Sequence, residues 1–267
     1  MSNFMLIPNK KNITGYADKF NEFILPVQGL SIGFNEYFTI SEAKALSLKY
    51  NIHVIINKFF HSVEIEELHK MIDELNFVKS FFVEDLGVAS LIERKRVVLF
   101  QNHITSSYAN INALNEVGYE KIVVSNELTI DELTEIRKKC TSKLYYFLVN
   151  RNMLMYSRRK LITNYFKNYK IDDHKYLYHM NETVSKKELI FKEEGTSTCV
   201  FNGDVFCASK YLEKLNMDNY IINLNNIDEE TINVIIENYD NTNLYQKIKC
   251  DYYFLENEIN YKVKTDE

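Results

Sequence analysis

The chain repeats one pattern through its first 150 residues. A short apolar run rich in β-branched and aromatic residues is followed by a polar residue or two, and then by a stretch whose apolar residues recur at spacings of three and four. The first part is typical of a buried strand and the second of an amphipathic helix, so the repeat predicts parallel βα units. We expect strands at 4–8, 30–34, 52–57, 80–85, 97–103, 121–127 and 143–150.

Helices are expected between these strands, and a capping box marks the start of two of them. Thr39 with Glu42, and Thr129 with Glu132, combine a hydroxyl and a carboxylate that can each accept a hydrogen bond from a free backbone N–H group. Gly118 suits the C-terminal end of the helix before the sixth strand. The expected helical ranges are 39–51, 62–76, 86–95, 106–118 and 129–140.

Seven strands by residue 150, in a chain of 267 residues, favour a (β/α)8 TIM-type barrel over an open doubly wound sheet. No GxGxxG motif follows the first strand, which weakens a dinucleotide-binding interpretation further. Residues 219–224 are a candidate eighth strand, with 228–241 as its helix. Residues 156–217 are then an insertion between strands seven and eight, in which 187–215 has the pattern of a β-hairpin and a helix. We predict one barrel domain over 1–267, and the pattern leaves open whether the barrel is complete or distorted.

Composition and charge narrow the function classes. The chain is 46% hydrophobic and carries a formal net charge of -5, which argues against nucleic-acid binding through overall charge but leaves room for a local basic patch. The apolar run near the start is too short for a signal sequence, and no later run approaches the roughly 20 apolar residues of a membrane span. We therefore expect a cytoplasmic protein without membrane contact. The four cysteines include no CxxC pair and fit reduced, buried thiols.

Candidate site residues follow from the barrel, because active sites in this fold lie at the carboxyl ends of the strands. Polar residues are also expected there simply because the chain turns to solvent, so each side chain has two readings. The strand ends place together Asn57 and Lys58, Glu84 and Asp85, Gln101, Asn102 and His103, Ser125, Asn126 and Glu127, and Asn150, Arg151 and Asn152.

The carboxylates in this set have more than one possible role. Glu84, Asp85 and Glu127 could supply a general acid and base or bind a divalent cation. Alternatively, Glu127 could form an ion pair with Arg151 on the neighbouring strand. His103 could act as a general base or cap the next helix. The sequence has no HExxH, GxSxG or P-loop motif, so we assign no metal site and no conventional nucleophile.

The segment 143–166 resembles the signature of peptidase family U32, the collagenase-like group. Phe147, Tyr156, Ser157, Arg159 and Leu161 stand at positions that match the family pattern. Upstream, "FFVEDLGVASLI" and "KIVVSNELTIDEL" are similar to steps of the same family, and downstream "KEEGTSTCVFNGDVF" is similar to another. The resemblance is collinear over 30–224. It implies a barrel-type domain and peptidase activity on peptide or protein substrates.

Other branches of this family take part in hydroxylating RNA bases or quinone rings with a cysteine-bound iron–sulfur cluster. Here Tyr145 stands where relatives have Glu, and Asn150 and Arg158 stand where they have Gly. Met153 and Lys160 stand where relatives have the Cys ligands. Neither side chain can replace a thiolate ligand, so we expect no iron–sulfur cluster and no other cofactor.

The retained arginine lies in a cationic turn, Arg158, Arg159 and Lys160. This turn could hold an anion, or it could pair with the acidic residues 172–173 and 193–194 of the insertion. As a peptidase, the protein would use Glu127, Arg159 and His103 as catalytic candidates. Its substrate-binding candidates would be Asn57, Lys58, Glu84, Asp85, Gln101, Asn102, Asn150, Arg151, Ser157 and Arg158. The alternative is a non-catalytic accessory protein that binds RNA or a larger U32-like partner, with tyrosines such as Tyr156, Tyr165 and Tyr169 stacking on bases.

Overall fold

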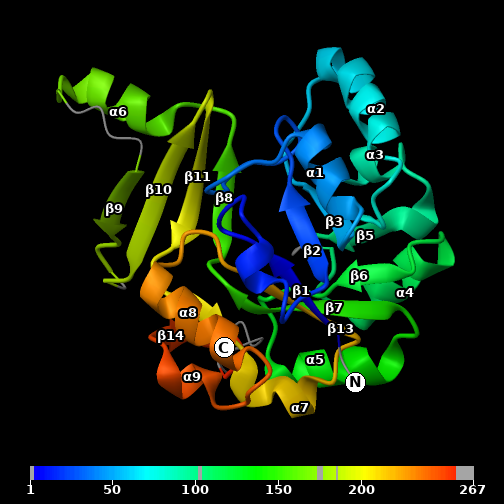
Figure 1. The fold of residues 1–267 in the computed structure, drawn as a ribbon. Coiled ribbons are helices and arrows are strands. Elements are labelled where there is room, and N and C mark those ends of the chain that lie inside the picture. The colour runs from blue at the N-terminus through cyan, green and yellow to red at the C-terminus, as the bar shows by residue number, and fades with distance from the viewer. Residues whose placement is uncertain (1–2, 102–103, 173–176, 185, 257–267) are drawn as a thin grey trace, which may run out of the picture.

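The computed structural model describes residues 3–101, 104–172, 177–184 and 186–256 of the chain. Eight parallel strands form a closed barrel, because the last of them, β13, pairs with both β1 and β7 (Figure 1). The predicted (β/α)8 fold is confirmed, and the barrel is complete. Its strands are β1 (Asn3–Ile7), β2 (Glu22–Pro26), β3 (Asn51–Ile56), β4 (Phe81–Val83), β5 (Val97–Phe100), β6 (Lys121–Val123), β7 (Lys143–Asn150) and β13 (Asn219–Asn223).

Helices follow most strands and cover the outside of the barrel. The two predicted capping boxes are present, with Thr39 Oγ1 accepting from Glu42 N and Thr129 Oγ1 accepting from Glu132 N. Gly118 follows its helix with φ of +95°, as expected of a C-terminal glycine. The α-helices on the barrel are α1 (Ile40–Ser47), α2 (Ile65–Glu74), α3 (Leu86–Ala89), α4 (Tyr108–Glu116), α5 (Ile130–Lys139), α8 (Glu229–Asn238) and α9 (Leu244–Lys247). Short 3-10 helices lie at η1 (Thr14–Tyr16), η2 (Ser62–Glu64) and η3 (Arg94–Arg96).

One predicted strand is wrong. The second strand is β2, and residues 30–34 form a loop above the end of the barrel. Gly29 and Gly33 have φ values of +86° and +87°, which an extended strand cannot contain. The loop is apolar because it is buried: Leu30 packs in the outer core and Phe34 closes the barrel interior.

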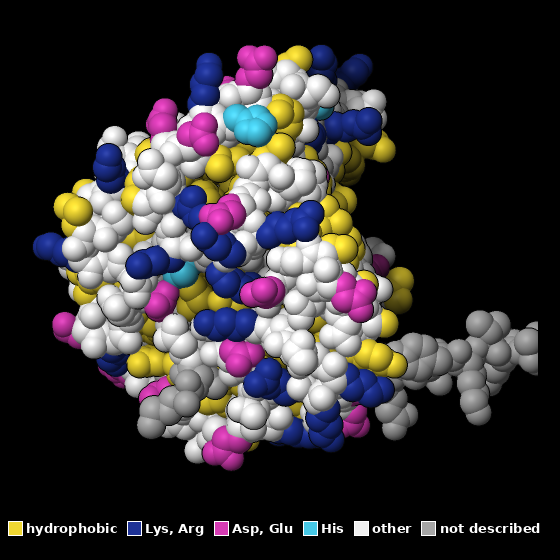
Figure 2. Space-filling model, turned by 90° about the vertical axis from the view of Figure 1, so that its right-hand side faces the viewer, with side chains coloured by type: hydrophobic (Ala, Val, Ile, Leu, Met, Phe, Trp, Pro, Cys, Tyr) yellow, Lys and Arg dark blue, Asp and Glu magenta, His cyan; other side chains and the backbone are white. Residues whose placement is uncertain are grey.

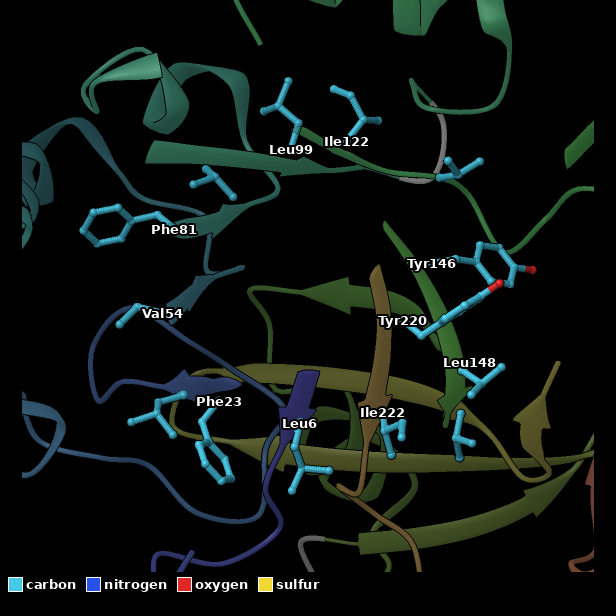
Figure 3. Packing of buried hydrophobic residues seen from close by; sticks show 14 of the residues in the cluster. Leu6, Phe23, Val54, Phe81, Leu99, Ile122, Tyr146, Leu148, Tyr220 and Ile222 are labelled. Carbon is cyan, nitrogen blue, oxygen red and sulfur yellow. The ribbon is translucent and has the colours of Figure 1, made fainter. Parts of the chain in front are cut away.

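Two hydrophobic layers follow from the alternation of side chains along each strand. On β1, Leu6 points outward into the layer between strands and helices, whereas Met5 and Ile7 point into the barrel. On β7, Tyr146 points outward into the same outer layer, whereas Tyr145 points into the barrel. Figure 3 shows members of the outer layer on strands all around the barrel. The inner layer fills the barrel with side chains, so its two mouths are separate sites.

The insertion between β7 and β13 forms a second sheet beside the barrel (Figure 1). Its antiparallel strand order is β8-β11-β10-β9. The predicted hairpin and helix are present as β10, β11 and α7, and the extra sheet begins at Met153, three residues before the predicted start. The elements are β8 (Met153–Ser157), α6 (Leu161–Tyr169), β9 (Leu177–Asn181), β10 (Glu188–Glu194), β11 (Ser197–Asn202), β12 (Val205–Cys207), η4 (Ser209–Tyr211) and α7 (Leu212–Leu215). Strand β12 pairs with β7 and with β14 (Cys250–Asp251), which extends the barrel sheet.

None of the helices in the described ranges is long and apolar enough to cross a bilayer.

Candidate active site at the carboxyl end of the barrel

A cavity of about 300 Å³ lies where the carboxyl ends of the barrel strands meet the inserted sheet. Parallel strands all end at one mouth of the barrel, so polar residues far apart in the sequence converge there. Strands β8 and β11 of the insertion supply the opposite wall. The predicted site residues that line this cavity are Asn57, Glu84, Gln101, Asn126, Glu127, Asn150, Arg151 and Asn152.

Other predicted site residues have structural roles outside the cavity. Lys58 forms an ion pair with Glu64, with 2.8 Å between Nζ and Oε1. Asp85 caps α3 by accepting a hydrogen bond of 3.0 Å from the Val88 backbone N–H. Asn102 and His103 fall outside the described residues, so their predicted roles stay predictions.

The cationic turn lies at the end of β8, and Ser157, Arg158 and Arg159 do not line the cavity. Arg158 donates to Glu64, with 3.2 Å between Nη2 and Oε2. The alternative pairing of this turn with residues 193–194 does not occur among the described residues, where Glu193 accepts a hydrogen bond from Thr163 and Glu194 accepts one from Tyr37. The acidic partner of Arg158 is instead Glu64, at the end of η2 on the barrel. It lies 94 residues earlier in the chain, so residue spacing could not connect the two.

The expected ion pair between Glu127 and Arg151 is also wrong. The Arg151 guanidinium donates to the backbone carbonyls of Asn202 and Gly203, at 3.1 Å from Nη1 for Asn202. Burial lowers the pKa of Arg151 below its ordinary value. The Glu127 side chain is exposed at the rim, and no ion pair to it occurs in the part of the chain that the structure describes. Arg151 therefore ties the inserted sheet to the barrel and keeps part of its guanidinium at the cavity.

Hydrogen bonds link five asparagine side chains that line the cavity. Asn126 and Asn150 both donate to Asn152 Oδ1, at 3.3 and 2.7 Å. Asn223 donates to Asn150 Oδ1 at 2.8 Å, and Asn225 donates to Asn223 Oδ1 at 3.0 Å. Sequence reasoning placed the first three at strand ends but missed Asn223 and Asn225. The signal was present, because both stand at the end of the eighth strand.

Three buried polar atoms on this cavity have no hydrogen-bond partner among the described residues: Gln101 Oε1, Asn126 Oδ1 and Arg151 Nε. A buried polar atom without a partner costs roughly 1–3 kcal/mol, so such atoms are rare in folded proteins. Two of these are acceptors and one is a donor. The cavity thus suits a ligand that presents both N–H donors and a carbonyl oxygen.

Glu84 is the titratable group whose pKa the cavity perturbs most. Burial raises the pKa of its carboxyl to about 7, and the charge of the neighbouring Asp85 adds to the effect. Its carboxyl accepts no hydrogen bond from the residues that the structure describes. A carboxyl that gains and loses a proton near neutral pH has the property required of a general acid and base.

Aromatic side chains form the apolar walls. Phe34, Phe100 and Phe147 come from the barrel side, and Phe59 packs against Tyr156 of β8 with 5.0 Å between ring centroids. Sequence reasoning assigned Tyr156 to base stacking on RNA but did not place the phenylalanines here. Phe34 and Phe59 lie in loops, which carry no periodic signal, whereas Phe100 and Phe147 lie on β5 and β7 at inward-facing positions of the strand alternation.

The thiols do not match the cysteine set of an iron–sulfur cluster. Cys140 follows α5 and Cys199 lies on β11, while Cys207 and Cys250 lie on the paired strands β12 and β14. Within the described ranges, no three His, Cys, Asp or Glu side chains are grouped to hold a metal ion. The residues present therefore do not fit the four-thiolate cluster of other branches.

The family model for peptidase family U32 matches residues 36–242. The structure of the U32 peptidase Mk0906 superposes with a TM-score of 0.52 at 12% identity, covering 84% of this chain and 92% of that one. A chitinase from Chromobacterium violaceum superposes with a TM-score of 0.38 at 10% identity, covering 83% and 93%. No curated protein matched the chain.

Proposed function

The chain belongs to peptidase family U32, and from this membership and the cavity we propose that it hydrolyses peptide bonds at the carboxyl end of the barrel. The observation that carries the proposal is the set of three partnerless polar atoms. A peptide offers N–H donors for Gln101 Oε1 and Asn126 Oδ1, and a carbonyl oxygen for Arg151 Nε. The aromatic walls would hold the neighbouring apolar side chains of the substrate.

The proposed chemistry uses Glu84 twice. As a carboxylate it takes a proton from a water molecule, whose oxygen attacks the peptide carbonyl carbon. The carbonyl oxygen then carries the negative charge, and Arg151 Nε–H donates a hydrogen bond to it. As a carboxylic acid, Glu84 next returns the proton to the leaving amine nitrogen when the C–N bond breaks. A pKa of about 7 leaves both protonation states populated at neutral pH, which this exchange requires.

The test is cleavage of a defined peptide mixture, followed by mass spectrometry so that each cut bond is identified. Glu84→Gln keeps the shape of the side chain and removes its titration, so we expect a loss of about 100-fold or more in cleavage rate. Arg159→Ala serves as the matched control, because this exposed arginine lies outside the cavity. It should cleave at the rate of the unmodified protein.

Two results would count against the proposal. Equal cleavage by all three proteins would identify a contaminating protease. No cleavage by any of them, with salt-sensitive RNA binding by the unmodified protein, would favour the accessory function in RNA modification instead.

A further inference from the structure

The opposite mouth of the barrel carries a second cavity of about 330 Å³. Most of its lining residues lie at the amino ends of seven barrel strands or just before them. Except for Asn51 and Lys79, each polar lining residue stands two positions before an inner-core residue, so both face the barrel axis. The pairs are Asn3 with Met5, Glu22 with Ile24, His53 with Ile55, Ser80 with Phe82, Lys121 with Val123, Lys143 with Tyr145, and Asn219 with Ile221.

Positive charge is in excess in this cavity. Lys79, Lys121 and Lys143 line it, and Glu22 is its one acidic lining residue among those described. His53 does not add to the charge. Burial lowers the pKa of His53, and its ring lies between two partners, Glu22 Oε2 at 2.6 Å from Nε2 and Ser80 Oγ at 2.6 Å from Nδ1.

Glu22 is fully engaged by its neighbours, since Asn51 also donates to its carboxylate at 2.9 Å. No lysine of the cavity forms an ion pair with a carboxylate in the described part of the chain. Lys121 Nζ donates to the backbone carbonyl of Lys95 at 2.6 Å. Burial lowers the pKa of Lys121, and the nearby charge of Lys143 lowers it further. The charge of Glu120 acts on Lys121 and that of Glu22 on Lys143, so the lysines outnumber the carboxylate that lines the cavity but do not lack counter-charge.

An uncharged donor points to a ligand as well. Asn219 is 2% exposed, and its Nδ2 atom has no hydrogen-bond partner among the described residues. Three lysines and a buried amide N–H group thus line one cavity with a single, already bonded carboxylate. The amino-terminal mouth faces away from the inserted sheet. Figure 2 views the molecule from that side and shows Lys and Arg side chains across the middle of the face, with Asp and Glu side chains between them.

We infer that this cavity binds a phosphate dianion, either free or as a small phosphate monoester. Two negative charges balance the excess of three lysines over one glutamate. Phosphate oxygens accept charge-assisted hydrogen bonds from the ammonium groups and a neutral one from Asn219 Nδ2. The inference is independent of peptide hydrolysis, because the filled barrel interior separates the two mouths.

The experiment is isothermal titration calorimetry of the full chain at low ionic strength, with inorganic phosphate in one arm and phosphoserine in the other. We expect one site per chain, with the tighter of the two ligands showing whether the site takes free phosphate or a monoester. Lys121→Met and Lys143→Met should each weaken binding by about 10-fold or more. Lys167→Met, which removes the same charge from α6 on the inserted sheet, should leave the affinity unchanged.

Asn219→Leu separates a built site from diffuse positive charge, because it keeps the net charge and removes only the amide donor. Thermal unfolding without ligand checks that each variant is folded. The inference requires weaker binding by this variant as well as by the two lysine variants. It is overturned if neither ligand binds the unmodified protein, or if folded Lys121→Met and Lys143→Met bind as tightly as Lys167→Met does.

Discussion

Replacing Glu84 by glutamine should make the stability of the protein less dependent on pH. Burial raises the pKa of Glu84 from 4.5 to about 7 in the folded chain, whereas the unfolded chain exposes the carboxyl to water. Between these two pH values the folded protein keeps a proton that the unfolded chain releases. The unfolded state is therefore favoured progressively as pH rises through this window, and the loss is complete above pH 7.

The size of the effect follows from the same difference. Each unit of pKa corresponds to about 1.4 kcal/mol, so the shift from 4.5 to about 7 amounts to about 3 kcal/mol. Partial exposure of the Glu84 side chain makes this an upper value. Glutamine does not titrate, so the variant escapes this loss at pH 8 and gains nothing comparable at pH 4.5.

Urea unfolding at pH 5, 6, 7 and 8 measures this directly for the two proteins. The free energy of unfolding of Glu84→Gln minus that of the unmodified protein should rise with pH by up to about 3 kcal/mol and level off above pH 7. Titration of groups that do not interact with Glu84 cancels in this difference. If this difference in the free energy of unfolding does not change with pH, burial does not raise the pKa of Glu84 and the reasoning is refuted.

Three further predictions concern the scaffold. His53 should titrate below its ordinary pKa of 6.5, because burial disfavours the charged ring, and the neutral ring should carry its proton on Nε2, as ¹⁵N chemical shifts of the ring will show; a titration midpoint at or above 6.5 would mean that the Glu22 carboxylate outweighs burial. Gly33→Ala should destabilise the protein by more than about 1 kcal/mol in urea unfolding, because φ is +87° and the new Cβ atom would lie 2.9 Å from Met153 Cε; an unchanged midpoint would be inconsistent with this geometry. Thr129→Ala should cost about 1 kcal/mol through loss of the α5 cap, and Thr129→Ser should restore most of it.

The barrel could be predicted because its signals are local. Period-two and period-3.6 patterns mark the strands and helices, and the hydroxyl and carboxylate of a capping box lie only three residues apart. The missed strand β2 shows the limit of this approach. Both 22–26 and 30–34 are apolar runs, and only the backbone conformation of Gly29 and Gly33 shows that the second is a buried loop.

The site residues also differ in whether the sequence could predict their position. Glu84, Gln101 and Asn150 were predicted because strand ends of a barrel converge by topology alone. Arg158 was misplaced because its position depends on how the inserted sheet docks, and its partner Glu64 is 94 residues away. The polar layer at the amino-terminal mouth was missed because the search was confined to the carboxyl ends of the strands.

The pH dependence of kcat/KM for peptide cleavage tests the central claim most directly, since it reports the ionisation of the free enzyme's base. The account predicts that kcat/KM rises about tenfold per pH unit below neutrality and levels off above a pKa of about 7, the value of Glu84. Any residual cleavage by Glu84→Gln should lack this inflection. The absence of cleavage by the folded protein, or an inflection near pH 7 that survives in Glu84→Gln, would contradict peptide hydrolysis by Glu84.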